Sequence, residues 1–111
     1  MDEVKVVRAL AALGQSHRLK VFRALVVAGN AGLTPGTISE ALALPAATLS
    51  FHLKELAAAG LVTQERASRH VIYRADYAFM NALLGYLTDH CCEGSPCIDS
   101  PTPFCDAGAH A

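Results

Sequence analysis

The spacing of apolar residues predicts a mostly helical chain, because these residues recur every three or four positions, the period of one helix face. A first helix begins after Asp2, which can cap it, and ends at Gly14. A second begins at Ser16 as its cap and ends at Gly29. These two amphipathic helices carry the apolar residues Val6, Val7, Leu10 and Leu13 in the first and Leu19, Phe22 and Leu25 in the second.

The next two predicted helices are separated by a very short connection. Thr34-Pro35 is typical of a helix start and opens a helix over residues 36–43. Pro45 starts the following helix, which Gly60 ends, and about three residues join the two. A connection this short requires the helices to lie adjacent and crossed, which is a helix-turn-helix. The predicted inward residues of the pair are Ile38, Leu42, Leu49, Leu53 and Leu56.

In a helix-turn-helix the second helix can enter the major groove of DNA with its N-terminal part. The outward positions of this helix are Ala46, Ala47, Ser50, Phe51 and Lys54, and His52 lies near the boundary between the two faces. Small alanines allow close approach to DNA, and a serine can donate a hydrogen bond to a base edge or a phosphate. Periodicity alone also fits any helical hairpin with a solvated face.

Two short strands, Leu61–Glu65 and His70–Arg74, are expected directly after that helix, with a turn over residues 66–69. A β-hairpin in this place is the wing of a winged helix. Arg66, Arg69 and His70 at its tip are positioned to reach phosphate or a minor groove, although an ordinary charged turn has the same composition. The predicted fold is mainly α with a small β-hairpin, a winged helix-turn-helix.

Length and charge refine this picture. A chain of 111 residues forms one domain whose helical faces a dimer would cover more fully. Residues 1–87 carry nine Lys/Arg and six Asp/Glu, whereas residues 88–111 carry four acids and no Lys/Arg. The acidic N-terminal start and the short apolar runs lead us to expect a cytoplasmic protein with reduced thiols and no membrane partner.

All four cysteines lie between residues 91 and 105. Asp76 can cap a last helix whose apolar stripe (Phe79, Met80, Leu83, Leu84, Leu87) predicts a dimer interface, and Cys91 and Cys92 follow its end. Gly94, Ser95 and Pro96 turn the chain and bring Cys97 within reach. Three thiolates with little enforced tetrahedral geometry favour As(III) or Sb(III). Cys105 is a fourth ligand, an exchange partner or an idle thiol.

Residues 42–73 resemble the winged-helix core of the ArsR/SmtB family of metal-responsive repressors. The resemblance rests on Ser50-x-His52-Leu53-x-x-Leu56 followed by Ala59-Gly60-Leu61-Val62, and on Leu13-Gly14-x-x-x-Arg18-Leu19 upstream. It covers about residues 5–90. It implies a homodimer joined by its first and last helices, a double-stranded operator with two-fold symmetry, and repression that an inducer relieves.

The chain departs from the family at three places. Residues 32–38 contain no thiol, where many arsenic-responsive members carry a Cys-x-Cys pair. Ala78 stands where zinc-sensing relatives need a histidine, and Ser68 replaces the usual wing glycine. Arsenite- or methylarsenite-responsive members have C-terminal cysteine clusters similar to Cys91, Cys92 and Cys97.

These observations predict a repressor released by trivalent arsenic, with residues 1–90 as the DNA-binding and dimerisation domain and residues 91–111 as a flexible inducer-binding tail. A redox-sensing repressor of the same fold, or one that responds to cadmium or lead, is the alternative. An enzyme is disfavoured, because its nucleophile and base would have to be tail cysteines and His90. We therefore expect no organic cofactor and no small-molecule substrate.

Overall fold

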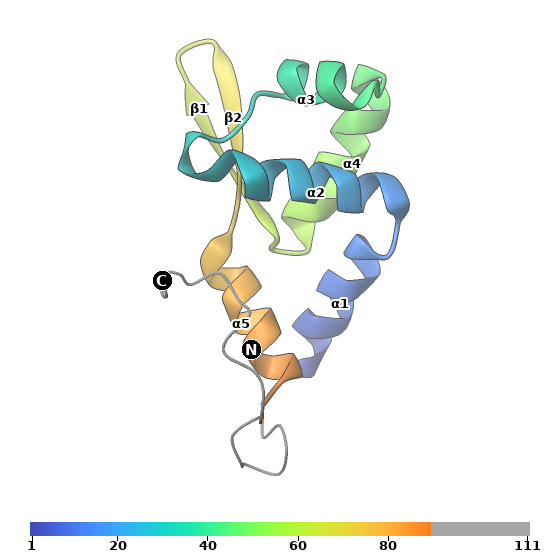
Figure 1. Ribbon diagram of the computed structural model, residues 1–111, viewed down its shortest axis with the longest axis vertical. Helices are drawn as coiled ribbons and strands as arrows, with labels where there is room; N and C mark the ends of the chain where they lie inside the picture. The colour runs from blue at the N-terminus through green and yellow to red at the C-terminus, as the bar shows by residue number, and fades with distance from the viewer. Residues whose placement is uncertain (90–111) are drawn as a thin grey trace.

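The computed structural model describes residues 1–89, which form helices and one antiparallel hairpin (Figure 1). This confirms the predicted fold class, mainly α with a small β-hairpin. In chain order the elements are α1 (Glu3–Leu13), α2 (Ser16–Ala28), a short 3-10 helix η1 (Gly29–Ala31), α3 (Pro35–Leu42), α4 (Ala46–Ala58), β1 (Val62–Ala67), β2 (His70–Ala75) and α5 (Tyr77–Leu87).

Local hydrogen bonds fix where the helices begin. Asp2 Oδ1 accepts from the Lys5 amide at 2.9 Å, and Asp76 Oδ1 accepts from the Phe79 amide at 3.0 Å, as the sequence predicts. Thr34 caps α3 with Pro35 at its first turn, also as predicted. Helix α2 differs. Its cap is Gln15, whose side-chain oxygen accepts from the Arg18 amide at 2.9 Å, and Ser16 is already helical.

Helix α4 lies at the centre of the hydrophobic core. Leu49, Leu53 and Leu56 are almost completely buried, which confirms the inward face predicted for this helix. They share one cluster with Leu25 of α2 and Ile38 of α3. Only Ala43, Leu44 and Pro45 separate α3 from α4, so the predicted helix-turn-helix is present.

The apolar residues that the sequence shows in α1 are only partly buried. Val7 and Leu10 are 57% and 43% exposed, and the residues that α1 buries are Val6, Ala9 and Ala12. Alanines permit a close approach, and α1 packs with this face against α2 and α4. Leu19, an apolar residue of α2, is likewise 44% exposed.

The hairpin is anchored to the helical body through β2. The Leu33 amide donates to the Tyr73 carbonyl at 3.0 Å, and the Tyr73 amide donates to the Leu33 carbonyl at 2.8 Å. Gly32, at φ +69°, makes this approach possible, since a Cβ there would lie 2.6 Å from the Ile72 side chain and 2.7 Å from the Tyr73 carbonyl oxygen. The strands are longer than predicted, and Ser68 and Arg69 alone form the turn.

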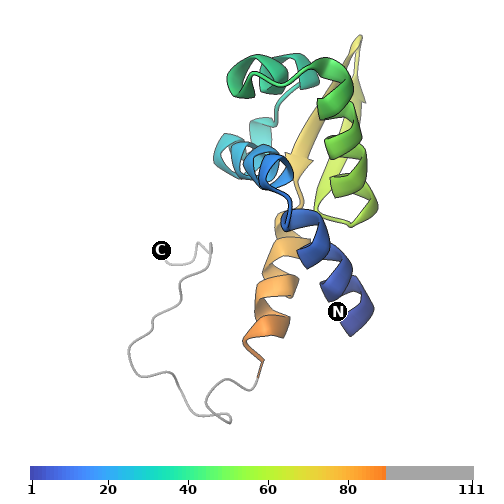
Figure 2. The same cartoon turned by 90° about the vertical axis from the view of Figure 1, so that its right-hand side faces the viewer.

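Helix α5 is fixed at its start by contacts with α2 and with the end of α4. The Tyr77 hydroxyl donates to the Val26 carbonyl at 2.9 Å. From there α1 and α5 extend toward the end of the molecule opposite the hairpin turn, as Figures 1 and 2 show. No helix within residues 1–89 has both the length and the apolar character needed to cross a membrane.

Candidate nucleic-acid interface

The outward face of α4 is open to solvent. All five side chains predicted to point outward are exposed: Ala46, Ala47, Ser50, Phe51 and Lys54. Pro45 caps the helix without a side-chain hydrogen bond, so the first amides of α4 are not covered by a capping side chain. The structure therefore presents a surface of small, polar and basic residues with one aromatic ring.

His52 is placed differently from the sequence expectation. It is only 6% exposed, inside the face that packs on α2 rather than at the boundary between faces. Its ring stacks on that of His17, with 5.9 Å between ring centroids. Burial lowers the pKa of His52, and the nearby charges of Arg18 and His17 lower it further. His52 thus packs between α4 and α2 and is not part of the exposed face of α4.

The hairpin turn carries exposed basic side chains. Arg66, Arg69 and His70 are solvent-exposed, and none has an ion-pair partner within residues 1–89. Arg74, farther along β2, is instead hydrogen-bonded within the domain. Its guanidinium donates to Glu65 Oε1 at 2.7 Å and to the Asn30 carbonyl at 2.7 Å. Positive charge is therefore concentrated at the turn itself.

The wing turn, α3 and the beginning of α4 all lie at one end of the molecule, away from α1 and α5 (Figures 1 and 2). The structure thus brings Arg66 and Arg69 to the same end as the first residues of α4, although these segments are separate in the sequence. This is the arrangement that a winged helix needs to contact one stretch of duplex.

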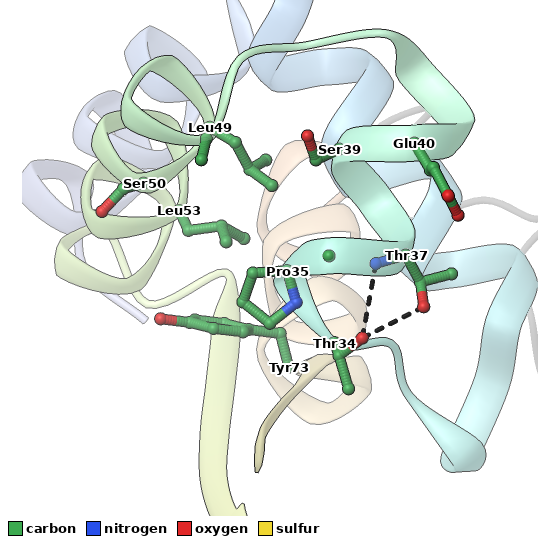
Figure 3. A pocket seen from close by; sticks show the side chains of 11 residues that line it. Thr34, Pro35, Thr37, Ser39, Glu40, Leu49, Ser50, Leu53 and Tyr73 are labelled. Atoms are coloured by element: carbon green, nitrogen blue, oxygen red, sulfur yellow. Dashed lines mark hydrogen bonds between the residues drawn. The ribbon is translucent and has the colours of Figure 1, made fainter. Parts of the chain in front are cut away.

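Between α3, α4 and β2 lies an open cavity of about 560 Å³. Thr34, Thr37, Ser50 and Tyr73 contribute hydroxyl groups to its lining, and Thr34 Oγ1 lies 3.0 Å from Thr37 Oγ1. Figure 3 shows the Tyr73 ring beside Pro35, with its hydroxyl extending toward α4. Hydroxyl groups at a helix N-terminus are suited to phosphate contacts.

Sequence reasoning missed this cavity. It used Thr34-Pro35 only as a helix-start signal and Tyr73 only as part of a strand. The threonines at the start of α3 were a usable signal, because helix N-termini attract phosphate. Tyr73 carried none, since its place beside α3 depends on the backbone bridge to Leu33.

The predicted thiolate site cannot be compared with this geometry. The residues that the structure does not describe include His90 and all four cysteines, Cys91, Cys92, Cys97 and Cys105. Within residues 1–89 no three His, Cys, Asp or Glu side chains are grouped in a way that could hold a metal ion. The last described helix ends at Leu87, shortly before Cys91. The metal-binding role of the cysteines stays a prediction.

Comparison with known proteins agrees with the fold. A helix-turn-helix domain family matches residues 13–65, from the end of α1 to β1. A comparison with curated proteins found no match. Several solved structures are similar over most of the chain. The fold and these matches define a winged helix-turn-helix transcriptional regulator, a class of DNA-binding proteins rather than of enzymes.

Three of these solved structures are each similar over more than four fifths of this chain. An ArsR-like transcriptional regulator from Rhodococcus sp. RHA1 has 25% identity and a TM-score of 0.72, covering 82% of this chain and 83% of its own. HlyU from Vibrio cholerae N16961 has 29% identity and a TM-score of 0.65, covering 83% and 99%. The homodimeric winged helix-turn-helix DNA-binding domain of a possible ArsR-family regulator from Mycobacterium bovis has 28% identity and a TM-score of 0.61, covering 82% and 84%. The chain is thus similar, over most of its length, to transcriptional regulators of the ArsR type.

Proposed function

We propose that this protein is a dimeric repressor that binds operator DNA and is released when trivalent arsenic binds the thiolates of Cys91, Cys92 and Cys97. The observation that carries the DNA-binding part is the exposed face of α4, which lies at the same end of the molecule as the basic wing turn. The inducer-binding part depends on the cysteine cluster in the sequence.

Operator binding would place the N-terminal half of α4 in the major groove. Ala46 and Ala47 leave room for close approach, and Ser50 supplies a hydroxyl that both donates and accepts. Lys54 one turn later is exposed and reaches outward as a point charge for phosphate. Arg66 and Arg69 contact the backbone beside the groove, which fixes the orientation of α4 without reading sequence.

A second copy of the chain would cover the apolar surface at the other end. Val4, Val7 and Leu10 of α1 are exposed, as are Tyr86 and Leu87 of α5. Both helices extend away from the DNA-facing end, so a symmetric partner there leaves both copies of α4 free (Figure 2). The relative from Mycobacterium bovis is described as homodimeric, which supports this arrangement.

The inducer would act through the cysteines beyond α5. Thiolates are soft ligands, and three of them satisfy a pyramidal As(III) or Sb(III) centre without a fourth donor. Because α5 ends at Leu87, ligation at Cys91 and Cys92 restrains the chain next to the dimer surface. A dimer so restrained no longer holds the spacing that the operator needs. By linkage, DNA weakens inducer binding by the same factor as inducer weakens DNA binding, typically about 5- to 150-fold.

A mobility-shift titration tests this function. The full chain is first used to select a duplex from a random-sequence pool, and the complex is then titrated with arsenite, methylarsenite, antimonite, cadmium, lead, zinc and peroxide. We expect arsenite or methylarsenite to release the DNA at the lowest concentration. Cys91→Ser and Cys92→Ser should keep operator affinity and lose the response, and Cys105→Ser shows whether the fourth thiol takes part.

The same titration separates the alternatives. Release by cadmium or lead at lower concentration than by any arsenical would replace arsenic as the inducer. Release by peroxide alone, reversed by a reducing agent, would identify a redox-sensing repressor of the same fold. Full arsenic response in both Cys91→Ser and Cys92→Ser would contradict the proposed thiolate site.

A further inference from the structure

Phe51 is an unusual residue for its position. Within residues 1–89 it is the only large apolar side chain of α3, α4 or the hairpin that is exposed, at 54%. The other exposed large apolar residues belong to the chain start, α1, α2 and α5. Phe51 therefore stands apart from the surface proposed for dimerisation, on the face proposed to contact DNA.

The ring of Phe51 is directed outward and supported from one side. Leu49, Leu53 and Leu56 define the buried side of α4, and the helical period of about 100° per residue puts Phe51 on the opposite side. Its ring centroid lies 5.8 Å from that of His52, with the planes tilted by 59°. Such a tilted pair is a favourable aromatic arrangement. His52 is itself buried and stacks on His17, so the side chain that supports the Phe51 ring is held in place by the domain.

The neighbours of Phe51 leave its outer surface accessible. One turn earlier on the same face is Ala47, whose methyl group covers little of the ring, and Lys54 follows at the start of the next turn. Both are exposed. If α4 lies in the major groove, the Phe51 ring would thus face the base edges and Lys54 would point toward the phosphate backbone of DNA.

A phenyl ring has no hydrogen-bond donor or acceptor, so it cannot recognise the polar pattern of a guanine, adenine or cytosine edge. The one apolar group that standard bases present in the major groove is the C5 methyl of thymine. We infer that Phe51 is a specificity-determining residue that packs on a thymine methyl group in each half-site of the operator. This inference rests on the proposed DNA-binding function and adds the base that the helix selects.

The test removes only the methyl group from DNA. The full chain selects its duplex from a random pool, and deoxyuridine then replaces thymidine at one position at a time in both half-sites. We expect one position at which uracil weakens binding about four-fold for each methyl removed. Phe51→Ala should bind the thymine and uracil duplexes equally. Phe51→Gln serves the same purpose, because a polar side chain is tolerated at this exposed position and lacks a ring that could pack on the methyl group.

Lys54→Ala is the matched control, because a phosphate contact weakens both duplexes by the same factor and keeps their ratio. Equal binding of thymine and uracil duplexes by the unaltered chain would overturn the inference and leave the proposed function intact. Persistence of the ratio in Phe51→Ala and Phe51→Gln would do the same. Recovery of no bound duplex from the pool would overturn the proposed function, and this inference with it.

Discussion

His17 of α2 stacks on His52 of α4, with 5.9 Å between ring centroids and 24° between ring planes. His52 Nδ1 is buried and has no hydrogen-bond partner within residues 1–89. Burial lowers the pKa of His52, and Arg18 and His17 act in the same direction. Burial and the neighbouring charges therefore favour the neutral imidazole of His52 where α4 packs on α2.

This preference for the neutral imidazole predicts a loss of stability in mild acid. The pKa of His52 is lower in the folded chain than its unfolded value of 6.5, so the unfolded chain takes up the proton first as pH falls. The free energy of unfolding should be constant for this group well above pH 6.5 and decrease as pH falls from about 6.5 toward the folded pKa. Urea unfolding at closely spaced pH values measures the decrease.

Two variants assign that decrease to His52. His52→Leu should have a smaller decrease in stability over the same pH range, because no buried imidazole remains to be protonated. His70→Ala, which removes an exposed histidine of β2, should keep the decrease. Identical pH profiles for His52→Leu and the unaltered chain would show that other groups cause the effect.

Tyr77 is predicted to stabilise the position of α5. Its hydroxyl donates to the Val26 carbonyl at 2.9 Å in a partly buried place. Tyr77→Phe should lower the free energy of unfolding by about 1 kcal/mol, because the carbonyl loses its partner and the ring is kept. Tyr73→Phe removes a hydroxyl that makes no hydrogen bond within residues 1–89 and should change stability by a few tenths of a kcal/mol at most. Equal effects in urea titrations would contradict this account.

Helix starts were predictable because their causes are local. The side chains of Asp2 and Asp76 reach amides three residues ahead, and the chain needs no other segment to make these bonds. The α3–α4 turn was predictable for the same reason. The bond from Tyr77 to Val26 joins residues 51 apart, and that from Arg74 to Asn30 joins residues 44 apart. Neither leaves a pattern along the sequence.

The helical period shows which residues of a helix are apolar, but it does not show which of them pack on the rest of the domain. It identified Val7 and Leu10 as apolar positions of a helix face, but it could not say that α1 packs on the domain through alanines instead. The candidate interface shows the same limit. The outward residues of α4 followed from the period of one helix, whereas the burial of His52 depends on where α2 lies.

Ala43 provides a test of backbone strain in the helix-turn-helix. It ends α3 in the left-handed region, at φ +55°, which glycine adopts more easily than alanine. Ala43→Gly should raise the free energy of unfolding by about 0.5–1 kcal/mol. The same substitution at Ala41, an exposed helical position, should lower it by a similar amount. Stability changes of the same sign in chemical unfolding would contradict the assignment of strain to Ala43.

The wing arginines should contribute to DNA binding without selecting sequence. Arg69→Ala is expected to weaken binding to specific and unrelated duplexes by similar factors, because phosphate is common to both. A plot of log affinity against log salt should become less steep by about 1. Arg23→Ala removes an exposed charge from α2 and should leave the slope unchanged. An unchanged slope in Arg69→Ala would show that this side chain makes no phosphate contact.

Leu10 tests the proposed dimer surface. It lies on the face of α1 that the domain leaves uncovered, so a carboxylate there is tolerated in the monomer but would be buried without a partner in a dimer. Leu10→Glu should shift the chain from dimer to monomer in sedimentation equilibrium and reduce operator affinity at least ten-fold, while helical content is kept. Val27→Glu places the same charge on α2 at a residue that is 76% exposed, and should stay dimeric. A dimeric Leu10→Glu variant with full operator affinity would exclude this face of α1 from the interface.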